Sequence, residues 1–65
     1  MNTLPIDRAI RIYTTVANRS ETKGARERLS EHLTKKYIDG ETDYHRLTVE
    51  GLSYLRAYYR ELDLN

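Results

Sequence analysis

The clearest periodic pattern lies near the start of the chain, where apolar residues recur every three or four positions. This repeat forms one face of a helix and consists of Ile6, Ala9, Ile10, Tyr13, Val16 and Ala17. Thr3 can cap the helix, and Pro5 suits its first turn, where the missing N–H of proline loses no hydrogen bond. Because Asn18 commonly ends helices, the pattern predicts a helix from about Pro5 to Ala17.

A polar, turn-rich segment at residues 18–24 separates this helix from a second one. Ser20 can cap the second helix. Its apolar positions are few and comprise Ala25, Leu29, Leu33 and Tyr37. Such a thin stripe covers part of a core but cannot form one alone. We expect the helix to end near Lys36, or near Ile38 if the next segment is not a strand.

Residues 36–47 allow two interpretations, both based on the turn signal Asp39-Gly40. In one, Gly40 ends the helix and a plain loop follows. In the other, residues 36–38 and 44–47 pair as a short antiparallel hairpin, because Tyr and Ile favour strands and the second segment alternates. We prefer the hairpin, which would have to lie against the helices because a two-stranded ribbon is marginal alone.

The last part of the chain predicts a third helix with Thr48 as its cap. One apolar stripe comprises Leu52, Leu55, Tyr59 and Leu62, and Tyr54 and Tyr58 form a second stripe beside it. The combined arc is wider than one core contact needs, so two interpretations stay open: ordinary packing of the tyrosines within the chain, or a surface for a second subunit or partner. The expected fold is mainly α, a single small three-helix domain spanning residues 1–65 with a short β-hairpin between helices 2 and 3.

Composition limits how such a domain can be stabilised. A chain of 65 residues buries only about 60% of the surface that it exposes when unfolded. It contains no cysteine, which excludes disulfides, and its two histidines alone argue against a structural zinc site. We expect no cofactor or metal. A second subunit is then the natural extra source of stability, and we expect a homodimer.

Charge and hydropathy narrow the possible partners. The chain has 11 basic and 10 acidic residues and a formal net charge of +1, which predicts no strong generic attraction to nucleic acid or membrane. No apolar run approaches the ~18 residues that span a bilayer, and the first residues lack the pattern of a signal peptide. We expect a cytoplasmic protein with no membrane partner. Because no nucleophile–base motif, His-x-x-x-His pair or Gly-rich phosphate loop occurs, we expect neither an enzyme nor a small-molecule substrate.

The sequence RLTVEGL at residues 46–52, followed by Tyr54-Leu55-Arg56, resembles the end of the wing in winged-helix DNA-binding domains. In those families an alternating strand ends in Leu-Thr and a Glu-Gly pair opens the next helix. Upstream, residues 26–33 resemble a recognition helix, so the likeness covers roughly residues 26–56. It implies a DNA-binding protein that regulates transcription. Before Gly24 the chain has one clear helix where the family has two.

Two sets of candidate binding residues follow. The nucleic-acid candidates are the polar residues that a recognition helix and its hairpin would present: Lys23, Arg26, Arg28, Ser30, Lys35, Lys36 and Arg46. Glu21, Glu27 and Glu31 lie among them and favour the alternative of a solvated helix face. The interface candidates are Tyr54, Leu55, Tyr58 and Leu62.

Two functions are compatible with these sets. The leading hypothesis is a small winged-helix-like DNA-associated regulator that contacts DNA through residues 23–36 and dimerises through its last helix. The alternative is a protein–protein interaction module or small inhibitor that docks through its Tyr-rich C-terminal helix.

Overall fold

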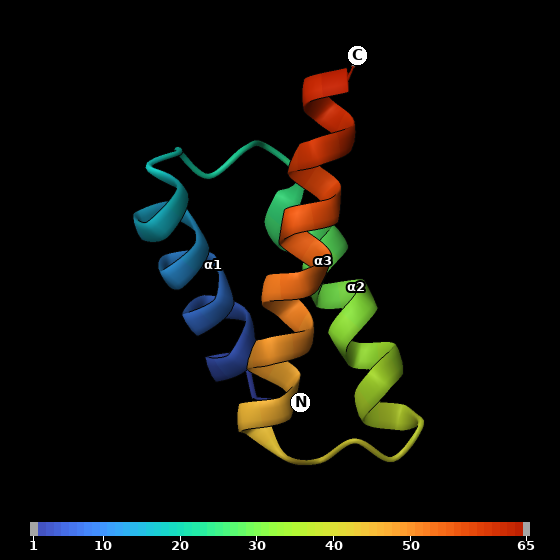
Figure 1. Cartoon of the computed structure of the whole chain (residues 1–65). Helices are drawn as coiled ribbons and strands as arrows, with labels where there is room; N and C mark the ends of the chain where they lie inside the picture. Colours follow the sequence, from blue (N-terminus) through green and yellow to red (C-terminus); the bar gives the residue numbers. More distant parts are fainter. Residues whose placement is uncertain (1, 65) are drawn as a thin grey trace.

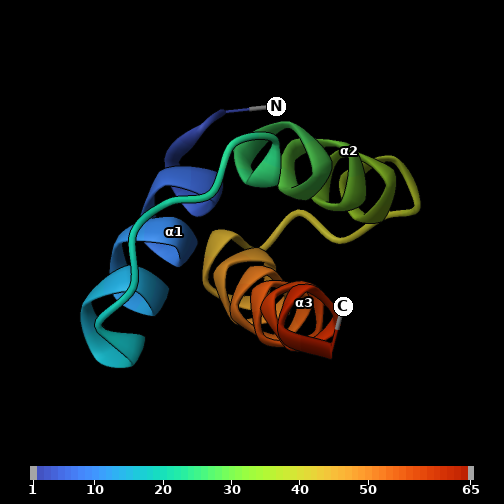
Figure 2. The same ribbon diagram turned by 90° about the horizontal axis from the view of Figure 1, so that it is seen from above.

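The computed structural model describes residues 2–64, which form three helices: α1 (Leu4–Ala17), α2 (Ala25–Ile38) and α3 (Tyr44–Leu64). Figure 1 shows α1 and α3 running in the same direction, with α2 antiparallel to both. Seen from above in Figure 2, α3 lies beside each of the other two helices, which contact each other less extensively. The mainly helical, three-helix part of the predicted fold is confirmed, and α3 is its central element.

The first helix has the predicted bounds within one residue. Pro5 lies in its first turn, and Asn18 ends it in the left-handed conformation with φ of 54°. The reversal lets the Arg19 N–H donate to the Thr14 carbonyl oxygen at 3.0 Å. Asn tolerates this conformation better than most residues, which is why the helix ends at this position.

The core lies where the three helices face one another. Its buried residues are Ile6, Ala9, Ile10, Leu29, Leu33, Leu47, Leu55 and Tyr59. Gly51 lies where α3 approaches α1 closely, because a Cβ at this position would be 2.8 Å from the Cβ of Ala9. A side chain at position 51 would therefore force α1 and α3 apart.

The predicted hairpin is wrong. Residues 36–38 form the last turn of α2, residues 44–47 form the first turn of α3, and no strand occurs between residues 2 and 64. The reason is a helix cap that begins α3 earlier than expected. The Oδ1 atom of Asp43 accepts hydrogen bonds from the backbone N–H groups of His45 at 2.9 Å and Arg46 at 3.4 Å.

The assignment of Thr48 as the cap of the third helix is wrong for the same reason. Thr48 lies one turn inside α3 and is buried. Its hydroxyl donates a hydrogen bond to the backbone carbonyl oxygen of Tyr44 at 2.8 Å. This bond gives the buried hydroxyl a partner within its own helix. Without the hairpin, α2 continues to Ile38, as the alternative interpretation predicted. No helix within residues 2–64 has the length and apolar character needed to traverse a bilayer.

Candidate functional site

An open groove of about 380 Å³ lies between the first half of α2 and the second half of α3. Arg28 forms the α2 side, and the α3 side consists of Tyr54, Ala57, Tyr58, Glu61 and Leu62. The α3 residues share one face because they are spaced three or four apart. The groove therefore combines aromatic and apolar surface with one charged residue from each helix.

A continuous run of stacked rings supports the aromatic part of the groove. His32 on α2 stacks on Tyr54 with centroids 4.6 Å apart, and Tyr54 in turn stacks on Tyr58 at 6.2 Å. Tyr58 then meets Tyr59 edge to face at 5.6 Å, and Tyr59 stacks on Tyr13 of α1 at 4.8 Å. Tyr54 and Tyr58 are each half-buried and pack against the core. Both residues thus pack against the core and also line the groove.

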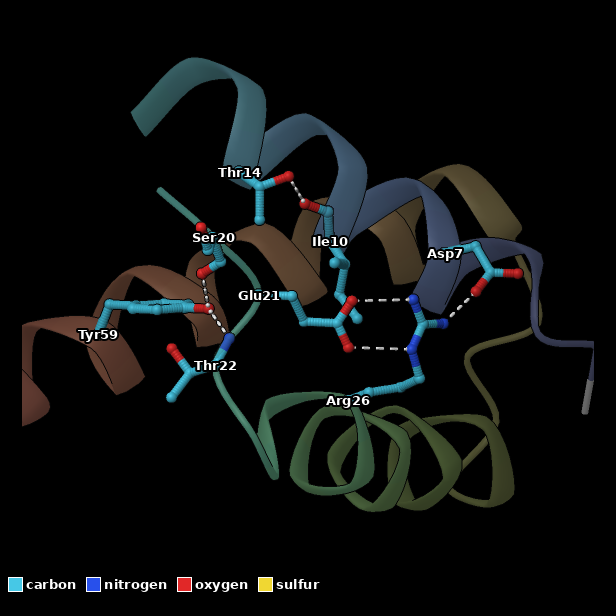
Figure 3. Close-up of polar contacts among 8 residues, drawn as sticks. All are labelled: Asp7, Ile10, Thr14, Ser20, Glu21, Thr22, Arg26 and Tyr59. Carbon is cyan, nitrogen blue, oxygen red and sulfur yellow. Dashed lines mark hydrogen bonds and ion pairs between the residues drawn. The ribbon is translucent and has the colours of Figure 1, made fainter. Parts of the chain in front are cut away.

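Tyr59, next in sequence to Tyr58, is only 2% exposed. Its hydroxyl accepts a hydrogen bond from the Thr22 backbone N–H at 2.9 Å and donates one to the Ser20 carbonyl oxygen at 3.1 Å (Figure 3). Both partners belong to the connection between α1 and α2. The hydroxyl of Tyr59 therefore fixes this connection against α3, and Ser20 contributes its backbone rather than the predicted helix cap, since α2 begins only at Ala25.

An ion pair at the same end of the molecule strengthens this attachment. The guanidinium of Arg19 donates two hydrogen bonds to the carboxylate of Asp63 at 2.8 and 2.9 Å and lies 4.7 Å from the ring centroid of Tyr59. These hydrogen bonds lower the pKa of Asp63 below its ordinary value and raise the pKa of Arg19. Because the side chains of this ion pair are partly exposed, the pair is a modest contribution to stability.

The structure divides the predicted interface residues. Tyr54, Tyr58 and Leu62 all line the groove, and Leu62 is 41% exposed. Leu55 is only 1% exposed and belongs to the core, so it offers no surface to a partner. Ala57 also lines the groove, a position that its i, i+3 spacing from Tyr54 could have indicated from sequence.

The structure separates some of the predicted nucleic-acid residues from one another. Arg28 faces α3 in the groove, whereas Arg26 and Ser30 line a separate hollow on the α1 side of α2, together with Ile6 and Asp7. These residues therefore face different sides of α2. Lys23 and Lys35 are exposed outside both hollows.

Carboxylates already engage several of these cations. Arg26 donates to Asp7 and, from Nε, to Glu21 at 3.2 Å (Figure 3), and these hydrogen bonds raise its pKa. Lys36 Nζ lies 4.0 Å from Glu50 Oε1, and Arg46 Nη1 lies 3.9 Å from Glu41 Oε2. By contrast, no ion pair within residues 2–64 involves Arg28.

The groove brings together two tyrosines, two small or apolar side chains and two opposite charges. His32 Nε2 lies 3.6 Å from Glu50 Oε1, but the part of the chain that the structure describes contains no group of three metal-binding side chains. Comparison with protein-family models, curated proteins and solved structures yields no match to this chain. The groove is an open hollow of this three-helix domain that is lined by aromatic side chains.

Proposed function

We propose that this chain is a small non-enzymatic protein that acts by binding another protein in the groove between α2 and α3. The observation that carries the proposal is the arrangement of Tyr54 and Tyr58, whose rings contact neighbouring rings and which both line the open groove. Tyr and Arg are enriched at protein interfaces and among the residues that dominate binding energy. Arg28 and these two rings place both residue types in one groove.

The fixed positions of the rings favour binding. Ordering a flexible side chain at an interface costs roughly 0.5–1.5 kcal/mol, and a side chain already held in place avoids most of that cost. The ring of Tyr54 stacks on those of His32 and Tyr58, which restricts its motion before any partner arrives. Arg28, exposed beside the rings, can donate to a carboxylate of the partner.

DNA association, which the winged-helix resemblance implies, stays a competing prediction. Two observations make it the weaker candidate. The candidate cations lie on different flanks of α2, and Arg26 would have to exchange Asp7 and Glu21 for phosphates. With a formal net charge of +1 the whole chain also has no strong long-range attraction for DNA.

Site-specific photo-crosslinking distinguishes the two functions. A photoreactive residue at Ala57 lies in the groove, whereas the same residue at the exposed Thr15 of α1 is a matched control outside it. We expect Ala57 to give a discrete protein adduct in the native host that Thr15 does not give, and Tyr58→Asp to abolish it. We also expect no salt-sensitive mobility shift of DNA. A DNA shift lost in Arg28→Ala, without any adduct at Ala57, would overturn the proposal.

A further inference from the structure

Opposite charges lie on the two sides of the groove. Arg28 belongs to α2 and Glu61 to α3, and both line the same hollow. A twofold axis relates two copies so that residue i of each contacts residue j of the other. An axis that passes through the groove between these two residues therefore brings Arg28 of each copy to Glu61 of the other. The charges of the groove in one copy are therefore complementary to those of the same groove in a second copy.

We propose that the occupant of the groove is a second copy of this chain, bound about a twofold axis, with two reciprocal Arg28–Glu61 ion pairs. The inference rests on the proposed function, because it takes the groove to be a protein-binding surface. It adds the identity of the partner and the pairing that selects it. If this axis is perpendicular to α3, the two α3 helices run antiparallel to each other across the interface.

The uncharged residues between these ion pairs suit a self-association surface. A residue at a twofold axis meets its own copy, so a charge there would be repelled. Tyr58 lies on α3 between Tyr54 and Glu61 and is not a charged residue, so two such rings can stack across the axis. Ala57, which also lines the groove, is likewise uncharged.

The rest of the molecule also favours a second copy as the partner. The formal net charge of +1 makes the long-range repulsion between two copies weak. A domain of 65 residues has little core of its own, and oligomerisation is a common source of additional stability at this size. Leu62 is 41% exposed at one end of the groove and would be covered by the second α3.

Charge reversal tests the reciprocal pairing. In a dimer of Arg28→Glu, the two new carboxylates at position 28 face the two native carboxylates of Glu61. In a dimer of Glu61→Arg, the two new guanidinium groups at position 61 face the two native guanidinium groups of Arg28. We expect each variant to weaken dimerisation by roughly tenfold or more. In a mixture of the two variants, the new carboxylate at position 28 of one copy faces the new guanidinium at position 61 of the other. The second pair keeps its native Arg28 and Glu61, so the mixture should form a heterodimer about as strong as the wild-type dimer.

Sedimentation velocity of the wild type, each variant and their equimolar mixture provides the measurement. Arg8→Glu makes the same charge change on the exposed side of α1 and should leave the dimer intact. Circular dichroism checks that every variant is helical. A wild-type monomer at high micromolar concentration, or a mixture no stronger than its components, overturns the second copy as partner. The proposed function would still stand if Ala57 then captured a different protein, and would fall if it captured none.

Discussion

Tyr58 and Tyr59 are adjacent in sequence, yet they lie on two sides of α3 that differ in exposure and in the contacts that they offer. Tyr59 is 2% exposed, stacks on Tyr13 and uses its hydroxyl to hold the α1–α2 connection. Tyr58 is half-buried, and part of its ring lines the open groove opposite Arg28. One ring completes the fold, and the other is supported by the fold but is not enclosed by it.

The difference shows that residue type does not decide whether a tyrosine of this helix is enclosed by the fold or left partly exposed. What decides it is whether a neighbouring element covers the ring and satisfies its hydroxyl. The segment 18–24 passes over Tyr59 and supplies one donor and one acceptor. On the other side α2 reaches Tyr54 through His32 and leaves the groove open. Substitutions on the two sides should therefore have separable effects on stability and on association.

Removing the Tyr59 ring should have the largest effect. Truncation of a buried aromatic residue to alanine costs about 3–5 kcal/mol. The whole core of a domain this small supplies about as much, so we expect Tyr59→Ala to be largely unfolded. Tyr58→Ala removes the same atoms from a half-buried position and should stay folded. Urea titration followed by circular dichroism at 222 nm, the usual helix signal, compares them, and similar midpoints for the two variants would contradict the distinction.

Gly51 and Ala57 extend the comparison to the small residues of α3. The Cβ added by Gly51→Ala lies 2.8 Å from the Cβ of Ala9, so α1 has to move away. We expect a net destabilisation of about 2 kcal/mol, because overpacking outweighs the roughly 1 kcal/mol that alanine gains in helix propensity. Ala57→Gln enlarges a residue in the open groove and should change the free energy of unfolding by less than about 0.5 kcal/mol.

A compensating substitution tests whether crowding between α1 and α3 causes the destabilisation expected for Gly51→Ala. Ala9→Gly removes the atom against which the new Cβ would press. The double variant Gly51→Ala/Ala9→Gly should therefore be more stable than the sum of the single effects predicts. If the two effects are simply additive in urea titrations, crowding between α1 and α3 does not explain the glycine.

Removing only the hydroxyl of Tyr59 should have a smaller effect. Tyr59→Phe keeps the stacked ring but leaves the Thr22 N–H and the Ser20 carbonyl without their partner. We expect a loss of about 1 kcal/mol. Faster amide hydrogen exchange at Thr22 would locate the loss in the α1–α2 connection. Tyr58→Phe serves as the control, and an equal loss in that variant would argue against a specific role of the Tyr59 hydroxyl.

The sequence predicted the helices well where one periodic stripe and a strong terminator coincide, as in α1 with its stop at Asn18. It failed at residues 36–47, where short stretches containing Tyr and Ile fit either the end of a helix or a strand. The decisive feature was the choice of cap. Asp43 and Thr48 are both good N-cap residues, and the burial of Thr48 in the folded domain selects the earlier start.

Only the α3 side of the groove could be predicted from the sequence in the same way. The i, i+4 spacing of Tyr54, Tyr58 and Leu62 reveals their common face without any tertiary information. Arg28 joins them only because α2 packs antiparallel to α3 at a particular level, which no local pattern specifies. The same packing fixes which flank of α2 each cation occupies, so the separation of Arg26 from Arg28 was equally hidden.

The smallest expected effect concerns the ion pair beside Tyr59 and depends on pH. Hydrogen bonds from Arg19 hold the pKa of Asp63 below its ordinary value of 3.8. A carboxyl group whose pKa is lower in the folded state stabilises that state above its unfolded pKa, and this contribution disappears as the pH falls through the folded pKa. Wild type should therefore be slightly more stable than Asp63→Asn near neutral pH, and the difference should vanish in acid. Urea titrations of both proteins from about pH 6 to about pH 2 measure it. High salt should also reduce the difference, since both side chains are partly exposed. A difference that persists unchanged at the lowest pH would mean that the ion pair does not secure the Tyr59 side of α3.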